Sequence, residues 1–361
     1  MAKAPAFTVS DIDELHADVQ RCAELAGLTY ICGEESGLTR ARRGKGFSYR
    51  DPCGKPLTDA EVKARIVQLA IPPAWQKVWI CPSADGHILA TGEDDRGRKQ
   101  YIYHPRWRAV RDLLNFYRLI LFAQHLSEIR SYTSQQLRRR TLDRDRVLAA
   151  MLRIIDLSYI RIGNESYAED NDSYGLSTLT RRHVKVTGDT VAFDFPAKSG
   201  QAADFQVTDR GVARVVTALL ESRNRRLFSV EGKPIGSDEV NQQLLELTGE
   251  HITAKDFRTW GGTLTAFEYL ESRQDSDRPA EREAIKAVDE AAEALGNTRS
   301  VARAHYVHPD LLEIYTEHTF ADYLARSKPR RLAGLEPAEQ RLAGLLTELF
   351  DTEFSLLNTR S

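Results

Sequence analysis

The sequence predicts an α+β fold: a small sheet-rich domain over residues 1–105, then a mostly helical domain over residues 106–361 that contains a three-stranded β meander. Three observations support this prediction. Short apolar and aromatic runs, separated by glycine, proline and aspartate, fill the first part. Long stretches with apolar residues at helical spacing fill the second part. A chain of 361 residues is also longer than one ordinary domain and suits two.

The first domain is expected to begin with a helix over residues 11–26, with Ser10 at its N-cap. Residues 29–105 then read as strands and turns, because short apolar runs alternate with turn residues. One helix over residues 58–69 should interrupt them, and a Pro-Pro pair soon after it should stop it. The runs expected to form strands are LTYIC, KVWIC, HILATG and KQYIYH.

The second domain should consist of amphipathic helices around one antiparallel meander. Residues 184–207 alternate in polarity around a TGDT turn and a PAKSGQ turn, which predicts the meander. Thr208, Ser237 and Thr253 stand where three helices would need an N-cap. Apolar residues at helical spacing predict helices over 107–121, 143–157, 209–223, 238–247, 254–271 and 279–295, and one helix or two over 336–358.

Composition excludes some classes of protein. No run of about 18 apolar residues is present, so we expect no membrane-spanning helix. The first residues do not resemble a signal peptide, and we expect a soluble, cytoplasmic protein. The four cysteines, Cys22, Cys32, Cys53 and Cys81, match no zinc spacing and are expected to be small buried hydrophobic residues. With no Walker pattern and no acidic triad at metal spacing, we expect neither a nucleotide nor a metal cofactor.

Charge is distributed unevenly along the chain. The net charge of −2 does not indicate a nucleic-acid partner, but binding depends on the local field rather than on the total. A single basic cluster would be typical of a solvated face, whereas three of them favour a phosphate-binding surface. The clusters are Arg40, Arg42, Arg43, Lys45 and Arg50; Arg96, Arg98, Lys99, Arg106, Arg108 and Arg111; and Arg130, Arg138, Arg139, Arg140, Arg144 and Arg146.

Five segments resemble blocks of a known enzyme superfamily and occur in its order. GNTRSVARAHY, which ends at Tyr306, resembles the C-terminal active-site block shared by type IB DNA topoisomerases and tyrosine recombinases. KDFRTWGGTLTAFEYL and SYIRIGNESYAEDNDSYGLSTL are similar to the blocks that carry two catalytic arginines, here Arg258 and Arg161. FPAKSGQ lies in the turn where these enzymes place a catalytic lysine, here Lys198. DRGRKQYIYHPRW resembles the DNA-contacting segment of poxvirus-like topoisomerases.

The resemblance implies a role for each matching residue. Tyr306 would attack a phosphodiester, and Arg161 and Arg258 would stabilise the charge on its nonbridging oxygens, which planar guanidinium groups suit. Lys198 would protonate the leaving 5′-oxygen as a general acid. The resemblance also implies DNA contacts from a further set of residues, namely Arg98, Gln100, Tyr101, Tyr103, Tyr167 and Lys255.

One catalytic position departs from the common pattern. Many relatives have histidine nine residues before the tyrosine, where this chain has Asn297. An amide cannot exchange a proton near neutral pH, but its NH₂ group can donate a hydrogen bond to a phosphate oxygen. The alternative interpretation is that Asn297 only caps the short helix after Gly296.

The resemblance therefore implies a type IB topoisomerase that relaxes double-stranded DNA, acts as a monomer without ATP or metal, and is associated with the nucleoid in the cytoplasm. Two alternatives remain. A tyrosine recombinase usually has histidine where this chain has Lys255, and a helical rather than sheet-like N-terminal domain. A non-catalytic DNA-binding protein of the same fold would be expected to have lost some of the catalytic residues. Here all four are present, namely Arg161, Lys198, Arg258 and Tyr306.

Overall fold

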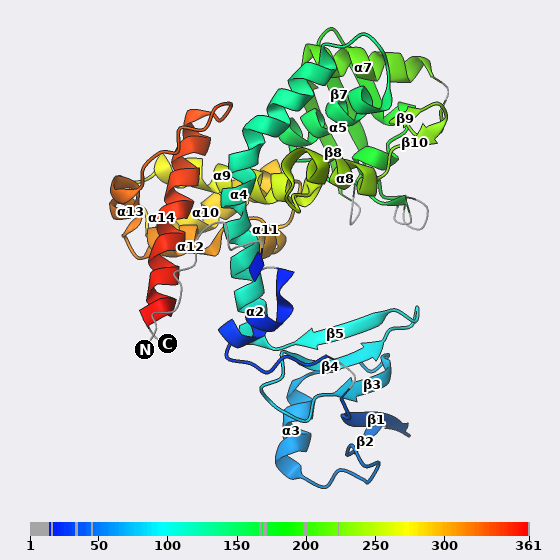
Figure 1. The fold of residues 1–361 in the computed structure, drawn as a ribbon, viewed down its shortest axis with the longest axis vertical. Helices are drawn as coiled ribbons and strands as arrows, with labels where there is room; N and C mark the ends of the chain where they lie inside the picture. The colour runs from blue at the N-terminus through cyan, green and yellow to red at the C-terminus, as the bar shows by residue number, and fades with distance from the viewer. Residues whose placement is uncertain are drawn as a thin grey trace. The chain divides into compact units, whose positions relative to one another are not determined.

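The computed structural model describes residues 14, 15, 17–32, 35–44, 46–165, 168, 172–197, 201–222 and 224–359, with the backbone alone for 353–359. By its internal contacts the chain divides into two compact units, of which one is Ser10–Asn115 and the other contains Phe116–Ser361. The mixture of an N-terminal sheet, a mostly helical remainder and a small second sheet confirms the predicted α+β class (Figure 1). The domain boundary at residue 105 stays a prediction.

The N-terminal unit is an antiparallel sheet in the order β2-β1-β3-β4-β5. Helix α3 (Ala60–Gln68), capped by Asp59, packs on one face of it. The core between helix and sheet contains Leu38, Ile66, Val78, Ile80 and Ala90. The strands are β1 (Leu38–Arg43), β2 (Gly46–Arg50), β3 (Gln76–Ile80), β4 (Ile88–Glu93) and β5 (Lys99–Tyr103).

Strand β5 lies at an edge of this sheet and carries several of the predicted DNA contacts (Figure 1). Because successive side chains of a strand point to opposite faces, Gln100 and Ile102 share one face, while Tyr101 and Tyr103 share the other. Ile102 packs against the core under α3. The two tyrosines therefore belong to the opposite face of the sheet.

Two predictions for the N-terminal unit were wrong. LTYIC forms no strand and contributes only an isolated bridge between Thr29 and Gly86. The predicted first helix is interrupted at Asp18, whose extended backbone and side chain cap a separate helix α2 (Val19–Leu25); Ser10 lies outside the described residues. At LTYIC the backbone bonds to the distant residues Asp85 and His87, whereas at Asp18 the break comes from a local N-cap.

The sequence missed strands β1 and β2, which lie in the first basic cluster. Arg40 does not face solvent there, since its guanidinium donates to the carbonyl oxygens of Ile71, Pro72 and Trp75 at 3.1, 2.9 and 2.8 Å. Its alkyl stem can be buried while its charged end is satisfied by these carbonyls. A basic residue was thus part of the internal structure of the unit rather than of a phosphate-binding surface.

Helix α4 (Pro105–Leu137) begins in the N-terminal unit, continues into the helical unit, and is much longer than the predicted helix over 107–121. Beyond residue 121 its buried residues Leu126, Ile129, Thr133 and Leu137 still recur at helical spacing. The polar residues between them hid this pattern. The other long helices are α5 (Arg144–Ser158), α7 (Arg210–Glu221), α8 (Ser237–Thr248), α9 (Ala254–Glu271), α10 (Ala280–Ala294) and α14 (Pro337–Thr359).

The predicted meander is confirmed as the antiparallel sheet β6-β7-β8. Its strands are β6 (Val184–Thr187), β7 (Thr190–Pro196) and β8 (Ala202–Thr208), and β7 pairs with β8 from Thr190–Thr208 to Pro196–Ala202. Short elements that the sequence did not predict complete the unit. They are the 3-10 turns Leu176–Thr178 and Arg181–His183, the pair β9 (Ser229–Val230) and β10 (Lys233–Pro234), and helices α12 (Pro309–Thr316) and α13 (Phe320–Arg326).

One of the three predicted N-caps is confirmed. Thr253 caps α9, and its backbone N–H and hydroxyl both donate to Asp256. At α7 the cap is Asp209 rather than Thr208, because the Asp209 carboxylate accepts from the N–H groups of the first turn. At α8 the cap is Gly236, and Ser237 is already helical.

The cysteines only partly follow the prediction. Cys22 and Cys81 are buried, but Cys32 and Cys53 are exposed. Cys53 lies in the DPCGKP turn after β2, where a residue has no core to face. Across the described part of the chain, no helix has both the length and the apolar character that crossing a membrane requires.

Candidate active site

Tyr306 lies directly after α11 (Arg299–His305), where its backbone N–H donates to Ala302 O at 2.9 Å and ends the helix. Its carbonyl oxygen accepts from Thr263 Oγ1 of α9 at 3.2 Å. Gly262 of α9 makes this close approach possible, because a Cβ there would stand 2.6 Å from Tyr306 O. The backbone of the tyrosine is therefore seated on α9.

Arg258 lies on α9 one turn before this contact and is only 4% exposed. Its guanidinium carbon stands 5.0 Å from the centre of the Tyr306 ring. One Nη donates to Leu295 O at 2.9 Å, and the other donates to Tyr159 O. These two carbonyls come from the ends of α10 and α5, so three helices fix the position of one guanidinium.

Arg161 enters the site from the chain that follows α5. Tyr159 ends α5 in a left-handed conformation (φ 54°), and the chain then turns so that Arg161 O accepts from Leu176 N at 2.9 Å. Two glycines allow the segments to cross, since a Cβ on Gly175 would stand 2.5 Å from Gly163 Cα. The glycines of RIGN and SYGL thus allow the backbone around Arg161 to pack directly against the backbone around Gly175.

Asn297 accepts a hydrogen bond from an Nη of Arg161 through its Oδ1. Its amide nitrogen is buried and has no hydrogen-bond partner among the residues that the structure describes, and the same holds for Nε of Arg258. We call these two atoms, Arg258 Nε and Asn297 Nδ2, the open donors. The N-cap of α11 is Thr298, so the alternative that Asn297 caps this helix was wrong.

Positive charge surrounds the tyrosine hydroxyl. Burial raises the pKa of Tyr306, whereas Arg258 lowers it through its charge and hydrogen bonding. Arg161 and Lys255 lower it further by charge, and the net result is a Tyr306 pKa below the ordinary value. The phenolate, which is the nucleophilic form, is therefore favoured relative to a free tyrosine.

The two arginines also repel one another. Burial and then the charge of Arg161 lower the pKa of Arg258 to about 10, against the opposing effect of Tyr306. An anion placed between the two guanidinium groups would relieve this repulsion. The arrangement is thus suited to bind a group with two negative oxygens, as a phosphodiester has in a pentacoordinate state.

These side chains share one pocket of about 210 Å³ in the helical unit. Lys255 lines it from the first turn of α9, is exposed, and lies three residues before Arg258. Ser173 and Tyr174 also line it, although no sequence motif singles them out. The lining residues are Arg161, Ile162, Gly163, Ser173, Tyr174, Ala254, Lys255, Arg258 and Tyr306.

Two predicted site residues, Lys198 and Tyr167, lie outside the described residues. The ends of the β7–β8 turn that carries Lys198 are described, and Ala197 N donates to Gln201 O at 2.7 Å. Ala197 and Gln201 line a second pocket together with Arg161 and Arg258. Both described ends of the β7–β8 connection therefore line the same pocket as the two arginines.

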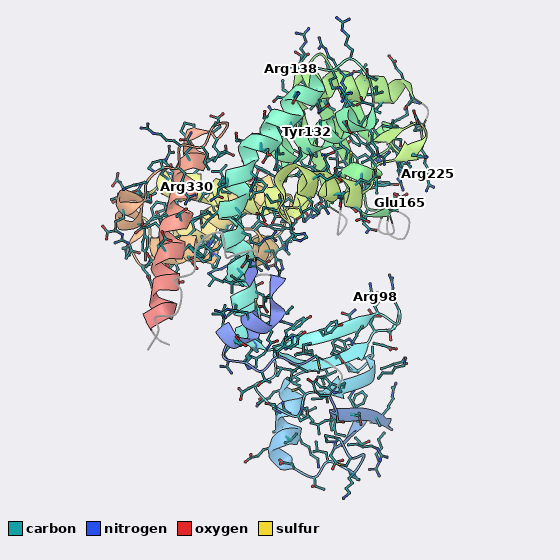
Figure 2. All side chains as sticks on the ribbon, in the orientation of Figure 1. Arg98, Tyr132, Arg138, Glu165, Arg225 and Arg330 are labelled. Atoms are coloured by element: carbon teal, nitrogen blue, oxygen red, sulfur yellow. The ribbon has the colours of Figure 1, made fainter. Side chains whose placement is uncertain are left out.

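Two of the predicted DNA contacts of the N-terminal unit, Arg98 and Gln100, contact Asp94, which the sequence did not single out. Arg98 pairs with Asp94 at 2.8 Å and lies at the turn between β4 and β5 (Figure 2). Gln100 Nε2 donates to the same carboxylate at 2.9 Å. Hydrogen bonds from the backbone and side chain of Arg98 lower the pKa of Asp94 to about 2, so it is ionised at any working pH.

The aromatic residues of β5 lie on the other face. Tyr101 is 39% exposed and stacks on Tyr103, with ring centres 5.6 Å apart. Lys99 Nζ lies 5.5 Å from the centre of the Tyr101 ring. A stacked pair with one exposed ring and a cation near it can contact bases or the phosphate backbone.

Comparison with known proteins agrees with this geometry. The family model "Eukaryotic DNA topoisomerase I, catalytic core" matches residues 104–323, and "Bacterial DNA topoisomerase IB, N-terminal domain" matches residues 46–94. The DNA topoisomerase 1B of Acanthamoeba polyphaga mimivirus is 29% identical over 294 residues, which cover 77% of this chain and 87% of that protein. The DNA topoisomerase 1B of Vaccinia virus (strain Copenhagen) is 20% identical over 294 residues, covering 77% and 86%.

The chain is also similar to a solved structure of a recombinase. It is the XerH site-specific recombinase bound to its palindromic difH substrate, with a TM-score of 0.34 and 13% identity over 64% of this chain and 62% of that chain. A likeness at that level supports no conclusion about this protein. Because the catalytic-core model spans residues 104–323, more than half of the chain, and the bacterial N-terminal model matches the sheet unit, this protein belongs to the type IB DNA topoisomerase family.

Proposed function

We propose that this type IB topoisomerase cuts one strand of duplex DNA with Tyr306, lets the duplex swivel, and reseals it. The Tyr306 oxygen attacks a backbone phosphorus, the bond to the 5′-oxygen breaks, and the strand becomes a 3′-phosphotyrosine and a free 5′-hydroxyl. Resealing is the reverse displacement, in which the 5′-hydroxyl attacks and tyrosine leaves. The observation that carries the proposal is the guanidinium of Arg258, 5.0 Å from the Tyr306 ring centre in a pocket that Arg161 also lines.

The open donors support contacts to the nonbridging oxygens. A buried donor is normally satisfied, and one that is not commonly marks a functional site. One open donor belongs to Arg258 itself. The other belongs to Asn297, whose Oδ1 accepts a hydrogen bond from Arg161. Fixed donors that meet charge developing in the transition state each contribute about 10²–10³-fold to the rate.

Lys198 is proposed as the general acid for the leaving 5′-oxygen. The support is its place in the β7–β8 turn, whose ends lie beside Arg161 and Arg258. Protonating a strongly basic leaving group typically gives about 10²–10⁴-fold. Lys198→Ala should therefore cleave slowly, and a substrate with a 5′-bridging sulfur, whose thiolate leaves without a proton, should restore most of the rate; no restoration would remove this role.

The partner is proposed to be double-stranded DNA, held between a clamp domain of residues 1–105 and a catalytic domain of residues 106–361. Arg98, Gln100, Tyr101 and Tyr103 of the clamp domain, with Tyr167 and Lys255 of the catalytic domain, are the proposed contacts. A clamp of this kind needs only one chain, so we propose a monomer, acting in the cytoplasm on nucleoid DNA. The phosphotyrosine conserves the energy of the broken bond, and resealing should need neither ATP nor a metal.

Plasmid relaxation tests the proposal directly. Wild-type protein should relax supercoils of both signs with EDTA present and no nucleotide. Tyr306→Phe should abolish relaxation and the covalent protein–DNA adduct seen on a denaturing gel, while DNA binding stays nearly intact. Tyr323→Phe is a matched control, because Tyr323 also lies under an arginine (Arg326, 4.4 Å) but on α13 outside the pocket.

Three outcomes would contradict the proposal. Relaxation by Tyr306→Phe at the wild-type rate would mean that another group is the nucleophile. Strict dependence on ATP or a divalent cation would exclude the stated mechanism. Strand exchange between two plasmids in place of relaxation would indicate a recombinase.

A further inference from the structure

A buried ion-pair network ties the C-terminal helix α14 to the helices that form the catalytic pocket. Arg130 of α4 pairs with Asp156 of α5 at 2.9 Å and with Glu339 of α14 at 2.8 Å. The side chains of Asp156 and Glu339 are only 6% and 5% exposed. Arg130 belongs to the third basic cluster of the sequence, so its charge is used inside the protein instead of on a DNA-binding surface.

Glu339 makes a second contact that reaches the catalytic helix. The indole N–H of Trp260, on α9, donates to Glu339 Oε1 at 3.2 Å, while Glu336 N donates to Oε2 at 2.8 Å. Burial raises the pKa of Glu339, but the hydrogen bonds and charge of Arg130 bring it below the ordinary value. Glu339 is therefore an anion whose oxygens are shared by α4, α9 and α14.

The network touches both elements that hold Arg258. Trp260 follows Arg258 by two residues, which on a helix turns it by about 200°, to the opposite side of α9. Asp156 precedes Tyr159 by three residues on α5, and Tyr159 O accepts from Arg258. The buried ion-pair network thus contacts the side of α9 opposite Arg258. It also contacts the last turn of α5, and the Tyr159 carbonyl oxygen after that turn accepts from Arg258.

We infer that Glu339 is a positioning residue for DNA cleavage: by joining α14 to Trp260 and, through Arg130, to α5, it holds Arg258 against Tyr306. This inference rests on the proposed roles of Tyr306 and Arg258. Helix α14 begins at Pro337, beyond the residues matched by the catalytic-core family model, which end at 323. The C-terminal segment is then part of the catalytic machinery of this chain.

The experiment compares Glu339→Gln, Trp260→Phe and the double variant in the full-length protein. Each is mixed in excess with a suicide duplex that cannot reseal, and the single-turnover cleavage rate is measured over a range of pH. DNA affinity is measured in a Tyr306→Phe background, and thermal melting reports stability. Glu348→Gln is the matched control, because Glu348 also lies on α14 and pairs with an arginine, Arg326, that is 54% exposed.

Positioning predicts a specific pattern. Glu339→Gln should slow cleavage about 10-fold, as expected when a charge-assisted hydrogen bond that orients a catalytic group is lost. DNA affinity should stay within about 2-fold of wild type. The double variant should be no slower than Glu339→Gln, because both changes weaken the same contact between Trp260 and Glu339. If Arg258 moves away from Tyr306, it lowers the Tyr306 pKa less, so that pKa rises. The acid limb of the pH profile of cleavage should then move to higher pH.

Other results overturn the inference. If Glu339→Gln lowers the melting temperature but leaves the cleavage rate and the pH profile of the folded protein unchanged, the network is only structural. Additive effects of the two single changes would show that Glu339 does not act through Trp260. If the wild-type protein fails to cleave at all, the proposed function fails instead, and the two failures are thereby distinguished.

Discussion

The two regions proposed to touch DNA satisfy their polar groups in opposite ways. In the catalytic pocket, Arg258 is 4% exposed, and its Nε, like Nδ2 of Asn297, has no hydrogen-bond partner among the described residues. At the β4–β5 turn, Arg98 is 63% exposed, and its charge is already met by Asp94. The Arg258 guanidinium is held in place by carbonyl oxygens of the protein. Arg98, in contrast, must give up its contact with Asp94 before it can contact DNA.

This difference separates chemistry from binding. Donors fixed by surrounding backbone lose little freedom when charge develops, so they act on the rate. Exposed arginines that trade one anion for another change affinity modestly and in a salt-dependent way. The following substitutions test that division, from the largest expected effect to the smallest.

Arg258→Ala should have the largest effect. It removes a guanidinium held by two carbonyls, with its charge beside Tyr306, and should slow single-turnover cleavage by about 10²–10³-fold. Arg258→Lys should recover little, because an ammonium cannot reach Leu295 O and Tyr159 O in the same fork geometry. Arg326→Ala, the arginine over Tyr323, is the control. If Arg258→Ala weakens DNA binding but leaves the cleavage rate unchanged, Arg258 contributes to binding, as proposed for Arg98, and not to the chemical step.

Asn297 should come next. Asn297→Asp keeps the oxygen that accepts from Arg161 but turns the open donor into a negative acceptor, so cleavage should fall by at least about 10²-fold. Asn297→His restores a donor and should be the mildest replacement. Both rates are measured on the suicide duplex. Equal activity of the aspartate and histidine variants would mean that Asn297 Nδ2 does not meet the phosphate.

Lys255→Gln should act mainly through pH. Lys255 lowers the Tyr306 pKa, so removing its charge raises that pKa. Because the phenolate attacks, the cleavage rate rises with pH up to the pKa, and the acid limb should move to higher pH while the alkaline plateau changes little. Lys286→Gln, an exposed lysine of α10, is the control. A uniform drop at every pH would instead indicate a DNA contact.

Asp94→Asn should have the smallest effect and the opposite sign. The amide oxygen can still accept from the Arg96 and Arg98 backbone N–H groups, but the charge that holds the Arg98 side chain is gone. Freed Arg98 should tighten DNA binding about 2-fold to 3-fold and steepen its salt dependence. Affinity is measured by titration in the Tyr306→Phe background. A change in cleavage rate at saturating protein would contradict the separation of the two regions.

The sequence predicted most of the second domain, because the apolar spacing of α9 and α10 and the alternation of β6 to β8 are local signals. It failed where the signal was not local. Arg40 looked like a surface charge, yet it binds carbonyls more than 30 positions away, which hid β1. The length of α4 was missed because its buried face after residue 121 is narrow and mixed with polar residues.

The candidate site shows the same limit. Arg161 and Asn297 are 136 positions apart, and no spacing rule joins them; only the resemblance to a family brought them, Arg258 and Tyr306 into one hypothesis. The structure brings these four side chains together, but their catalytic roles stay predictions, and Lys198 and Tyr167 lie outside the described residues. Asp94 and Glu339 were missed because an acid beside arginines is ordinary in sequence, and only contacts distinguish a turn anchor from a buried ion pair.

The two adjacent glycines of α9, Gly261 and Gly262, limit how the thermal stability of this protein can be raised. Alanine in place of a helical glycine is a standard route to higher thermal tolerance, since it restricts the unfolded chain. At Gly261 the new methyl would press into the ring of Tyr159, and at Gly262 into the main chain of Tyr306. A stabilisation programme guided by helix propensity alone would choose these two positions early and damage the reaction centre.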